Sequence, residues 1–306
     1  MTALAPALVR LAAKSGSNLV ESGMSLLLGP WLGQGLLRRA ASFQGPGRAA
    51  GPRCAISFDV DFRADVVALD SLLDHLAAHS LQASFALVGS WVEEYPDEHR
   101  ALVRAGHEVL NHTLTHPDNE EIDPDRHFHL LSPDELAGQI RGGHETIRDV
   151  LEVSPQGFRA PHFGHQHTEA VYPVLKTLGY TYSSSTLASR SPSWGWPHPA
   201  GRGLWELPVT VCPRHPFSSF DTWHLIRKTP SRHKPGDLLR HLEGLITEAL
   251  AESLPLVFYF DPRDAGRGGK DKGECLQALE MLAGSGLNLT TLGAWVEELK
   301  SINDRS

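Results

Sequence analysis

From Cys54 to the C-terminus, short apolar runs alternate with longer stretches whose apolar residues recur at helical spacing. The runs have the length and residue types of buried strands and lie at 54–58, 83–88, 108–110, 157–160, 180–184, 256–260 and 287–290, and a further segment of the alternation lies at 204–209. The intervening stretches predict helices at 66–79, 96–105, 132–151, 169–178, 236–252 and 272–285, with a last helix ending at Leu299. Repeated strand and helix units indicate a parallel sheet, and this many units favour an α/β barrel with ligand sites at the C-terminal ends of its strands.

The composition is that of a globular protein with a large core. The chain has 306 residues, of which 41% are hydrophobic and 21% are charged. A formal net charge of -8 argues against a nucleic-acid partner, because such proteins need a basic surface to displace counterions. Three widely spaced cysteines favour reduced thiols over a disulfide framework or a zinc finger. The 17 histidines are unusually many, and several fall in short polar clusters where chemistry is expected.

The first 52 residues differ from the rest of the chain. Before residue 44, four basic residues stand against one acid, Glu21, and are interleaved with apolar clusters; they are Arg10, Lys14, Arg38 and Arg39. The clusters are too short for a membrane span of about 20 residues and lack the layout of a secretory signal. Two interpretations stay open: helices packed on the domain, or an amphipathic element resting on anionic lipid. The Gly- and Pro-rich segment 45–52 predicts a linker, so we expect a helical extension at 1–52 and one larger domain at 53–306.

Two acids follow the first predicted strand directly. Because side chains alternate across a strand, Asp59 and Asp61 project to the same side, about 6 to 7 Å apart along the chain. A solvated strand end or a turn would explain such a pair without any function. The position at the C-terminal end of a barrel strand favours a ligand site instead.

Two histidines follow the third predicted strand. His112 and His116 are four residues apart, so a helical turn would place both imidazoles on one face, and Pro117 would end that turn. Loop histidines that only solvate or cap are the alternative. Two imidazole nitrogens and one carboxylate oxygen are typical ligands of a catalytic zinc or a related divalent ion, which leaves positions open for water and substrate.

The segment 157–164 places a basic residue at another strand end. A guanidinium at Arg159 could hold Asp59 ionised and oriented through a bidentate pair, as an alternative to an ordinary ion pair at the barrel rim.

In this order, the segments 57–61, 112–116 and 158–161 resemble the motifs of the polysaccharide deacetylase (NodB-homology) family of carbohydrate esterases. The resemblance covers about Cys54 to Leu299 and implies a distorted or incomplete (β/α)7-type barrel. It also implies divalent-metal-dependent removal of an N- or O-acyl group, usually acetyl from an amino sugar. Carried over by position, Asp59 is expected to be the general base, Arg159 to hold it, and the metal ligands to be Asp61, His112 and His116. The expected metal is zinc, with cobalt, nickel and manganese as alternatives.

Two features depart from the common family pattern. Val60 separates two acids that most members place side by side, as in a smaller branch that includes peptidoglycan-type deacetylases and relatives acting on small amides or cyclic ureides. The late strand 256–260 ends in Asp261, where the family usually has a histidine that serves as general acid. A buried carboxyl group with a raised pKa could donate that proton. Alternatively, Asp261 binds metal, the enzyme is impaired, or the proton comes from His162, His165, His215 or His224.

The remaining expectations concern the substrate and the location of the protein in the cell. By the resemblance, the backbone N–H of His162, just after Pro161, helps to stabilise an oxyanion. Trp196 and Trp223 lie in loops and are candidates to stack on a sugar ring, although such loops could simply cover the barrel. We expect a hydrolase that removes an acetyl or formyl group from an amino sugar or a related small amide, in the cytoplasm and in surface-glycan assembly at the inner face of a membrane. A binding protein that has lost turnover is the alternative.

Overall fold

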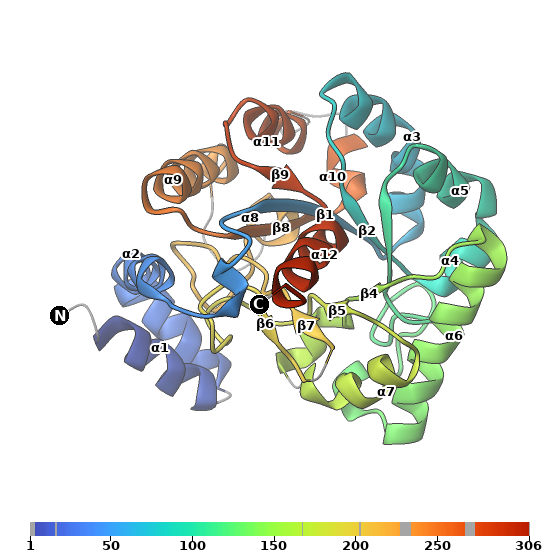
Figure 1. The fold of residues 1–306 in the computed structure, drawn as a ribbon, viewed down its shortest axis with the longest axis horizontal. Coiled ribbons are helices and arrows are strands. Elements are labelled where there is room, and N and C mark those ends of the chain that lie inside the picture. Colours follow the sequence, from blue (N-terminus) through green and yellow to red (C-terminus); the bar gives the residue numbers. More distant parts are fainter. Residues whose placement is uncertain are drawn as a thin grey trace.

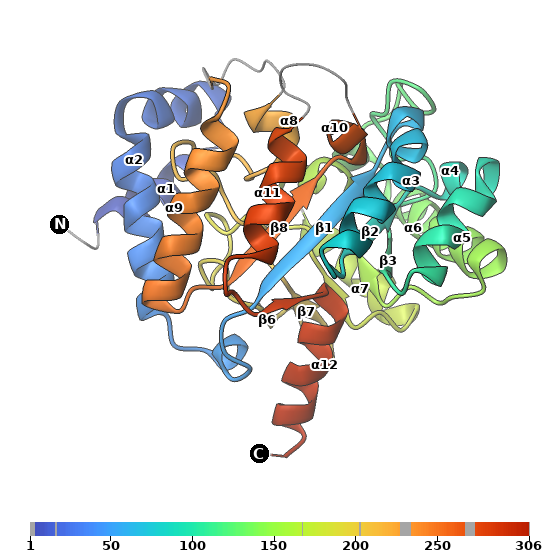
Figure 2. The same cartoon turned by 90° about the horizontal axis from the view of Figure 1, so that it is seen from above.

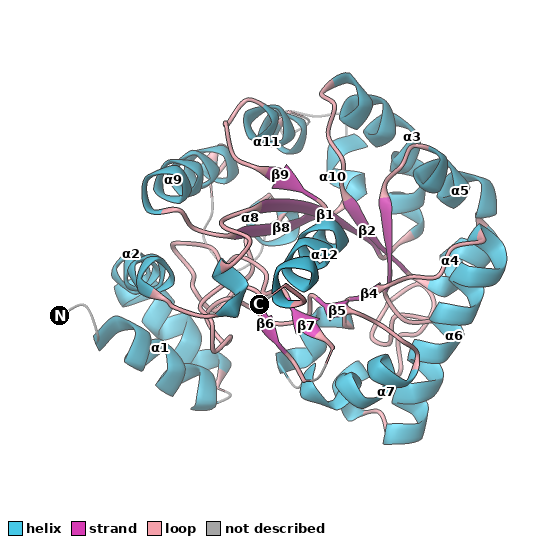
Figure 3. Cartoon of the chain, viewed as in Figure 1, coloured by secondary structure: helices cyan, strands magenta, loops and turns pink. Residues whose placement is uncertain are grey.

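A computed structural model describes residues 4–15, 17–166, 168–201, 203–226, 234–266 and 273–305. Short strands lie at the centre and helices surround them, as Figures 1 and 3 show. The strands are β1 (Cys54–Val60), β2 (Ser84–Leu87), β3 (Glu108–Asn111), β4 (Gly157–Phe158), β5 (Tyr182–Ser183), β6 (His198–Pro199), β7 (Trp205–Glu206), β8 (Leu256–Phe260) and β9 (Leu289–Thr290). The predicted α/β architecture is confirmed.

The strands form one curled sheet in the order β6-β7-β5-β4-β3-β2-β1-β8, and β9 also pairs with β1. Every pairing is parallel except that of β6 with β7. Beyond β7 the wall continues through irregular chain: the backbone N–H of Thr210 donates to the carbonyl oxygen of Val257 in β8 at 2.8 Å. The result is a distorted barrel, as the sequence led us to expect.

Helices cover the outside of this sheet and its two ends. They are α1 (Leu4–Ser15), α2 (Asn18–Ser42), α3 (Arg63–Ala78), α4 (Gly89–Glu94), α5 (Pro96–Arg104), α6 (Pro133–Leu151), α7 (Tyr172–Thr177), α8 (Thr222–Leu225), α9 (Asp237–Glu252), α10 (Pro262–Gly266), α11 (Glu274–Ala283) and α12 (Leu292–Asn303). The start of α6 shows how local sequence sets a boundary: Ser132 and Glu135 form a reciprocal capping box. Figure 2 shows β1 running from the end of the molecule near α12 towards the end near α8 and α10, so the C-terminal ends of the strands lie at the α8 end.

Apolar packing on the face of β1 opposite the two acids fixes this strand. All seven residues of β1 are buried. Phe58 stacks on Phe85 of β2 with ring centroids 5.0 Å apart and contacts Phe260 of β8 at 6.2 Å. Burying each such aromatic side chain contributes on the order of 2 kcal/mol. The neighbouring strands therefore hold the end of β1 firmly in place.

The N-terminal residues form two helices that pack on the barrel, where α2 lies beside α9 (Figures 1 and 2). A Cβ at Gly29 or Gly33 would overlap the carbonyl oxygens of Arg214 and Pro213, so only glycine permits this close approach. The segment 45–52, predicted to be a linker, contains one 3₁₀ turn, Pro46–Arg48. Among the described residues, no helix combines the length and the apolar content needed to cross a bilayer.

Candidate active site

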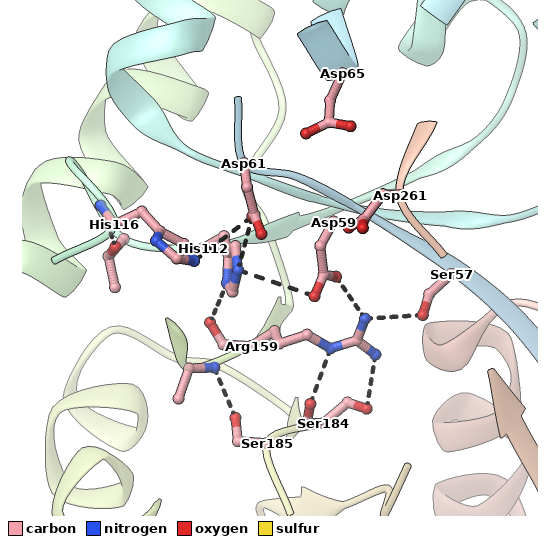
Figure 4. Close-up of polar contacts among 12 residues, drawn as sticks. Ser57, Asp59, Asp61, Asp65, His112, His116, Arg159, Ser184, Ser185 and Asp261 are labelled. Carbon is pink, nitrogen blue, oxygen red and sulfur yellow. Dashed lines mark hydrogen bonds and ion pairs between the residues drawn. The ribbon is translucent and has the colours of Figure 1, made fainter. Parts of the chain in front are cut away.

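The two acids at the end of β1 meet around one histidine, as expected from strand alternation. His112 Nε2 lies 3.2 Å from Asp61 Oδ1 and 4.0 Å from Asp59 Oδ2. Asp59 is the last residue but one of β1, and Asp61 follows the strand directly. Figure 4 shows Asp61 beside His112, and Asp59 between His112 and the guanidinium of Arg159. Their side chains have only 6% and 16% of their surface exposed, so this is not a solvated strand end.

The two histidines converge, but not on a helical turn. The chain after β3 is a loop in which Thr113 and His116 have positive φ values of 72° and 52°. The prediction of a helical turn is therefore wrong, although its consequence holds: the imidazole centroids of His112 and His116 are 4.7 Å apart. Left-handed residues turn the chain back towards β1, and His116 Nε2 comes within 3.6 Å of Asp61 Oδ1.

The donor set of this cluster fits a divalent metal ion. One ligand atom from each of Asp61, His112 and His116 lies within 4.8 Å of the other two. His112 Nδ1 donates to the carbonyl oxygen of Arg159 at 2.7 Å, so the lone pair is on Nε2, which faces the acids. Asp61 Oδ1 is buried and has no hydrogen-bond partner among the described residues. An unsatisfied carboxylate oxygen beside two imidazoles is the arrangement that an ion would complete.

The electrostatics of the three residues suit that interpretation. Burial lowers the pKa of His116 to about 3, so its imidazole is neutral and able to act as a ligand. Burial raises the pKa of Asp61, but the imidazoles of His116 and His112 outweigh it and hold that pKa below its usual range. Burial lowers the pKa of His112, yet its contact with Asp61 reverses the sign, so this position attracts a positive charge.

Arg159, directly after β4, lies completely buried beneath Asp59. Its Nη1 donates to Asp59 Oδ1 at 2.6 Å and to Ser57 Oγ at 2.9 Å. Its Nε and Nη2 donate to the carbonyl oxygen and the hydroxyl of Ser184, each at 3.0 Å. The expected bidentate pair is therefore wrong, because the other donors are directed to the two serines. Neither serine was assigned a role from the sequence, because a serine in or beside a strand gives no sign of a distant arginine partner.

This arrangement leaves Asp59 with one oxygen on Arg159 and the other towards His112. Burial raises the pKa of Asp59, and the charges of Arg159 and His112 oppose that rise. A carboxylate that is fixed on one side and faces the candidate metal ligands on the other can remove a proton from a group held between them.

Asp261 lies where expected, directly after β8. Figure 4 places it beside Asp59, on the side away from the two histidines. Its backbone N–H donates to Thr222 Oγ1 at 2.9 Å, and Arg263 Nη2 lies 3.8 Å from its Oδ2. Arg263 Nε also lies 3.5 Å from buried Asp65, whose pKa burial raises to about 7. Asp261 therefore shares an arginine with a second acid, which the sequence did not indicate.

The substrate-contact predictions have mixed outcomes. Trp196 is wrong: its side chain is completely buried and its indole N–H donates to the carbonyl oxygen of Ala40 at the end of α2. Trp223 is 47% exposed, and the Arg263 guanidinium lies 5.4 Å from its ring. Pro161 is buried at the start of a 3₁₀ turn, and His162 beside it is partly exposed.

The histidines considered as alternative proton donors lie in different parts of the structure. The His162 ring is 4.9 Å from that of His116, and its Nε2 is 3.9 Å from Asp118 Oδ2. His215 and His224 lie together, 5.5 Å apart, and line a cavity of about 790 Å³ beside α2. The side chain of His165 lies outside the described residues.

Comparison with known proteins gives relatives for part of the chain. The family model described as "Polysaccharide deacetylase" matches residues 47–183. A chitooligosaccharide deacetylase of Sinorhizobium fredii is 47% identical over 104 residues, which are 30% of this chain and 48% of that protein. A peptidoglycan-N-acetylglucosamine deacetylase of Bacillus cereus is 28% identical over 123 residues, or 40% of each. The chain thus spans less than half the length of these relatives.

Solved structures support the fold. A protein from Mycobacterium smegmatis assigned to the polysaccharide deacetylases aligns with a TM-score of 0.65 and 20% identity, over 83% of this chain and 92% of that one. A CE4 family pseudoenzyme from Bacillus anthracis aligns with a TM-score of 0.52 and 16% identity, over 81% and 66%. Residues 47–183, the part of the chain that carries both acids, both histidines and Arg159, belong to the polysaccharide deacetylase (NodB-homology) family.

Proposed function

We propose that the protein is a metal-dependent hydrolase that removes an acetyl or formyl group from the nitrogen of an amino sugar or a related small amide. The observation that carries the proposal is the pairing of two units: Asp59 held by Arg159, and the converging atoms of Asp61, His112 and His116. The names of the relatives, deacetylases of chitooligosaccharide and peptidoglycan, support an N-acetylated sugar as the substrate class.

The chain's own residues suit amide hydrolysis. Asp61, His112 and His116 would hold a divalent ion, most simply zinc, which polarises a carbonyl group and lowers the pKa of water. Asp59 would take a proton from the attacking water, and Arg159 would keep the Asp59 carboxylate oriented while it does so. Because Asp59 and Arg159 are both buried, the pair acts without reorganising solvent.

The later step requires a proton for the leaving amine. The backbone N–H of His162 would stabilise the oxyanion, and Asp261 would protonate the nitrogen from the opposite side of Asp59. Trp223, exposed next to Arg263, would contact the sugar.

A second function rests on Asp261 itself. With Asp in place of the usual histidine, the protein would bind an acylated sugar or a small amide without efficient turnover. A related fold occurs in a protein described as a pseudoenzyme, the one from Bacillus anthracis.

The test is acetate or formate release from a panel of N-acetylated and N-formylated amino sugars and their oligomers, with zinc-loaded protein. We expect release by the wild type and a loss of at least about 100-fold in Asp59→Asn, the scale of general base catalysis. The variant keeps the shape of the side chain and removes its basicity. Equal, background rates for both proteins across the panel would favour the binding protein.

The metal ligands are tested separately. His112→Ala and His116→Ala should each lower the bound metal by one ion per chain in elemental analysis. The exposed His129→Ala variant is the control and should keep the wild-type content. Full metal content in both ligand variants would refute the site.

We further propose that α1 and α2 rest on an anionic membrane surface at the cytoplasmic face, where surface glycans are assembled. Among the described residues, eight of the twelve exposed large apolar side chains lie on these two helices; they are Leu4, Leu11, Leu19, Val20, Leu26, Leu27, Leu28 and Trp31. The same two helices expose four basic residues, Arg10, Lys14, Arg38 and Arg39, whereas Glu21 is buried and paired with Arg190 at 2.5 Å. This combination of apolar and basic groups suits lipid with anionic headgroups, although the chain carries a net charge of -8.

Vesicle flotation tests the contact. The protein should float with phosphatidylglycerol vesicles and much less with phosphatidylcholine vesicles. Leu26→Ser should weaken flotation, whereas Leu250→Ser, a similarly exposed leucine on α9, should not. Equal flotation of the two variants would refute this orientation.

A further inference from the structure

A second group of potential metal ligands lies on the outer layer of helices, away from the strand ends that carry the catalytic residues. His75 is on α3, His79 is the residue that ends α3, and Glu280 is on α11. The two helices are neighbours in the ring seen in Figure 1. One ligand atom from each of the three residues lies within 4.8 Å of the other two. We infer that His75, His79 and Glu280 form a second divalent-metal site, which would join α3 to α11.

The geometry favours a shared ion over direct contacts. His75 Nε2 and His79 Nε2 lie 4.0 and 3.9 Å from Glu280 Oε1, too far for hydrogen bonds. Metal bonds of about 2.0 to 2.2 Å at tetrahedral angles would separate the ligand atoms by about 3.4 Å. Small rotations of the side chains would therefore close the set on one ion.

His75 supplies the observation that points to a ligand. Its side chain is 15% exposed, and its Nε2 is buried with no hydrogen-bond partner among the described residues. A buried nitrogen directed at a carboxylate, but beyond hydrogen-bonding distance, lacks the partner that such atoms normally have.

The helix supports the same site in two ways. Residues four apart at the end of α3 project to one side, and the rings of His75 and His79 are 4.6 Å apart. The C-terminus of a helix carries a partial negative charge, which stabilises a nearby cation. Imidazole with carboxylate selects zinc, nickel, cobalt or copper rather than magnesium or calcium.

Such an ion would act on structure rather than on catalysis. α3 follows β1, which carries the catalytic acids, and α11 leads into β9, which pairs with β1. Joining the two helices would restrain β1 from outside the barrel. Binding to the folded state alone would raise the thermal midpoint as the metal concentration rises.

The experiment counts zinc per chain by elemental analysis after chelator treatment and reloading of the full-length protein. We expect two ions in the wild type, one in His75→Ala, one in His79→Ala, one in His112→Ala and none in the His75→Ala/His112→Ala double variant. Asp74→Ala, an exposed neighbour on α3, is the matched control and should keep two. Glu280→Gln should weaken the second site while keeping the shape of the side chain.

Thermal unfolding separates the sites. In the His112→Ala background, zinc should raise the midpoint, and adding His79→Ala should remove that rise. Two results would refute the second site. The first is a single ion in the wild type that disappears in His112→Ala. The second is a second ion that persists in both His75→Ala and His79→Ala.

Discussion

Replacing Arg159 with methionine should destabilise the protein by about 3–5 kcal/mol, because it leaves the buried carboxylate of Asp59 without its partner. Both side chains are almost inaccessible, with 0% and 6% exposure, so water cannot compensate for the loss. Methionine fills much of the same volume, which limits the contribution from a cavity. The serines that bind the guanidinium also lose their charged donor, at about 1 kcal/mol or more each, but these costs overlap and do not add to the total.

A double-mutant cycle isolates the charge interaction. Asp59→Asn removes the negative charge while keeping the shape of the side chain, so Asp59→Asn/Arg159→Met contains no unpaired buried ion. We expect the double variant to be more stable than the sum of the two single effects predicts, with a coupling of about 1–3 kcal/mol. Arg159→Lys keeps a charge but cannot reach Asp59, Ser57 and Ser184 together, and should lie between the wild type and Arg159→Met.

The measurement is urea unfolding of metal-free protein at pH 7, followed by circular dichroism and by tryptophan fluorescence. Agreement of the two probes would support a two-state treatment of each variant. A cost below 1 kcal/mol for Arg159→Met, or full additivity in the cycle, would refute the argument that this pair is a buried structural unit.

Three further predictions use different parts of the molecule. Gly33→Ala should destabilise the protein, because the added Cβ would overlap the carbonyl oxygen of Pro213, and this cost should exceed the gain of a few tenths of a kcal/mol to about 1 kcal/mol that a stiffer unfolded chain provides. A thermal midpoint at or above that of the wild type would contradict the packing of α2. Burial lowers the pKa of His99, so the folded state disfavours its proton and stability should fall as pH drops below about 6.5; His99→Gln should reduce that slope in urea titrations, unlike exposed His129→Gln. Asp261→His should preserve or raise deacylation if this position donates the proton, whereas a collapse of the rate would assign the carboxylate another role.

The strand ends could be predicted from the sequence because they depend on local pattern. An apolar run followed by Asp59 and Asp61 specifies which face the acids occupy, and the capping box at Ser132 specifies where α6 begins. The approach of His112 and His116 was also predictable, but not by the helical turn that the spacing favoured. Positive φ at Thr113 has no sequence signal, because a β-branched residue rarely adopts it.

Contacts between distant residues explain what the sequence did not reveal. The donors of Arg159 are shared among Asp59, Ser57 and Ser184, which lie between 25 and 102 positions away. Trp196 was a candidate to stack on a sugar ring because it lies in a loop, yet its indole N–H donates to the carbonyl oxygen of Ala40, 156 positions earlier. Whether an aromatic residue contacts substrate or lies in the core depends on which other segment packs over it. The spacing of apolar residues along the chain gives no information on that packing.

The segment that covers Trp196 is the pair of N-terminal helices, α1 and α2. Their packing shows what supports one side of the barrel wall. Between β5 and β8 the barrel wall consists of very short strands and irregular chain. This part of the wall therefore has little regular β-sheet surface on which helices can pack. α1 and α2 lie against this part: the Arg10 guanidinium stacks on Trp194 at 4.0 Å, Arg190 pairs with Glu21, and Gly29 and Gly33 meet the backbone at 213–214. The same irregular stretch leads into α8, whose Thr222 accepts the backbone hydrogen bond of Asp261. The N-terminal helices therefore support the side of the barrel that positions Asp261, the residue that stands where the resemblance led us to expect a histidine.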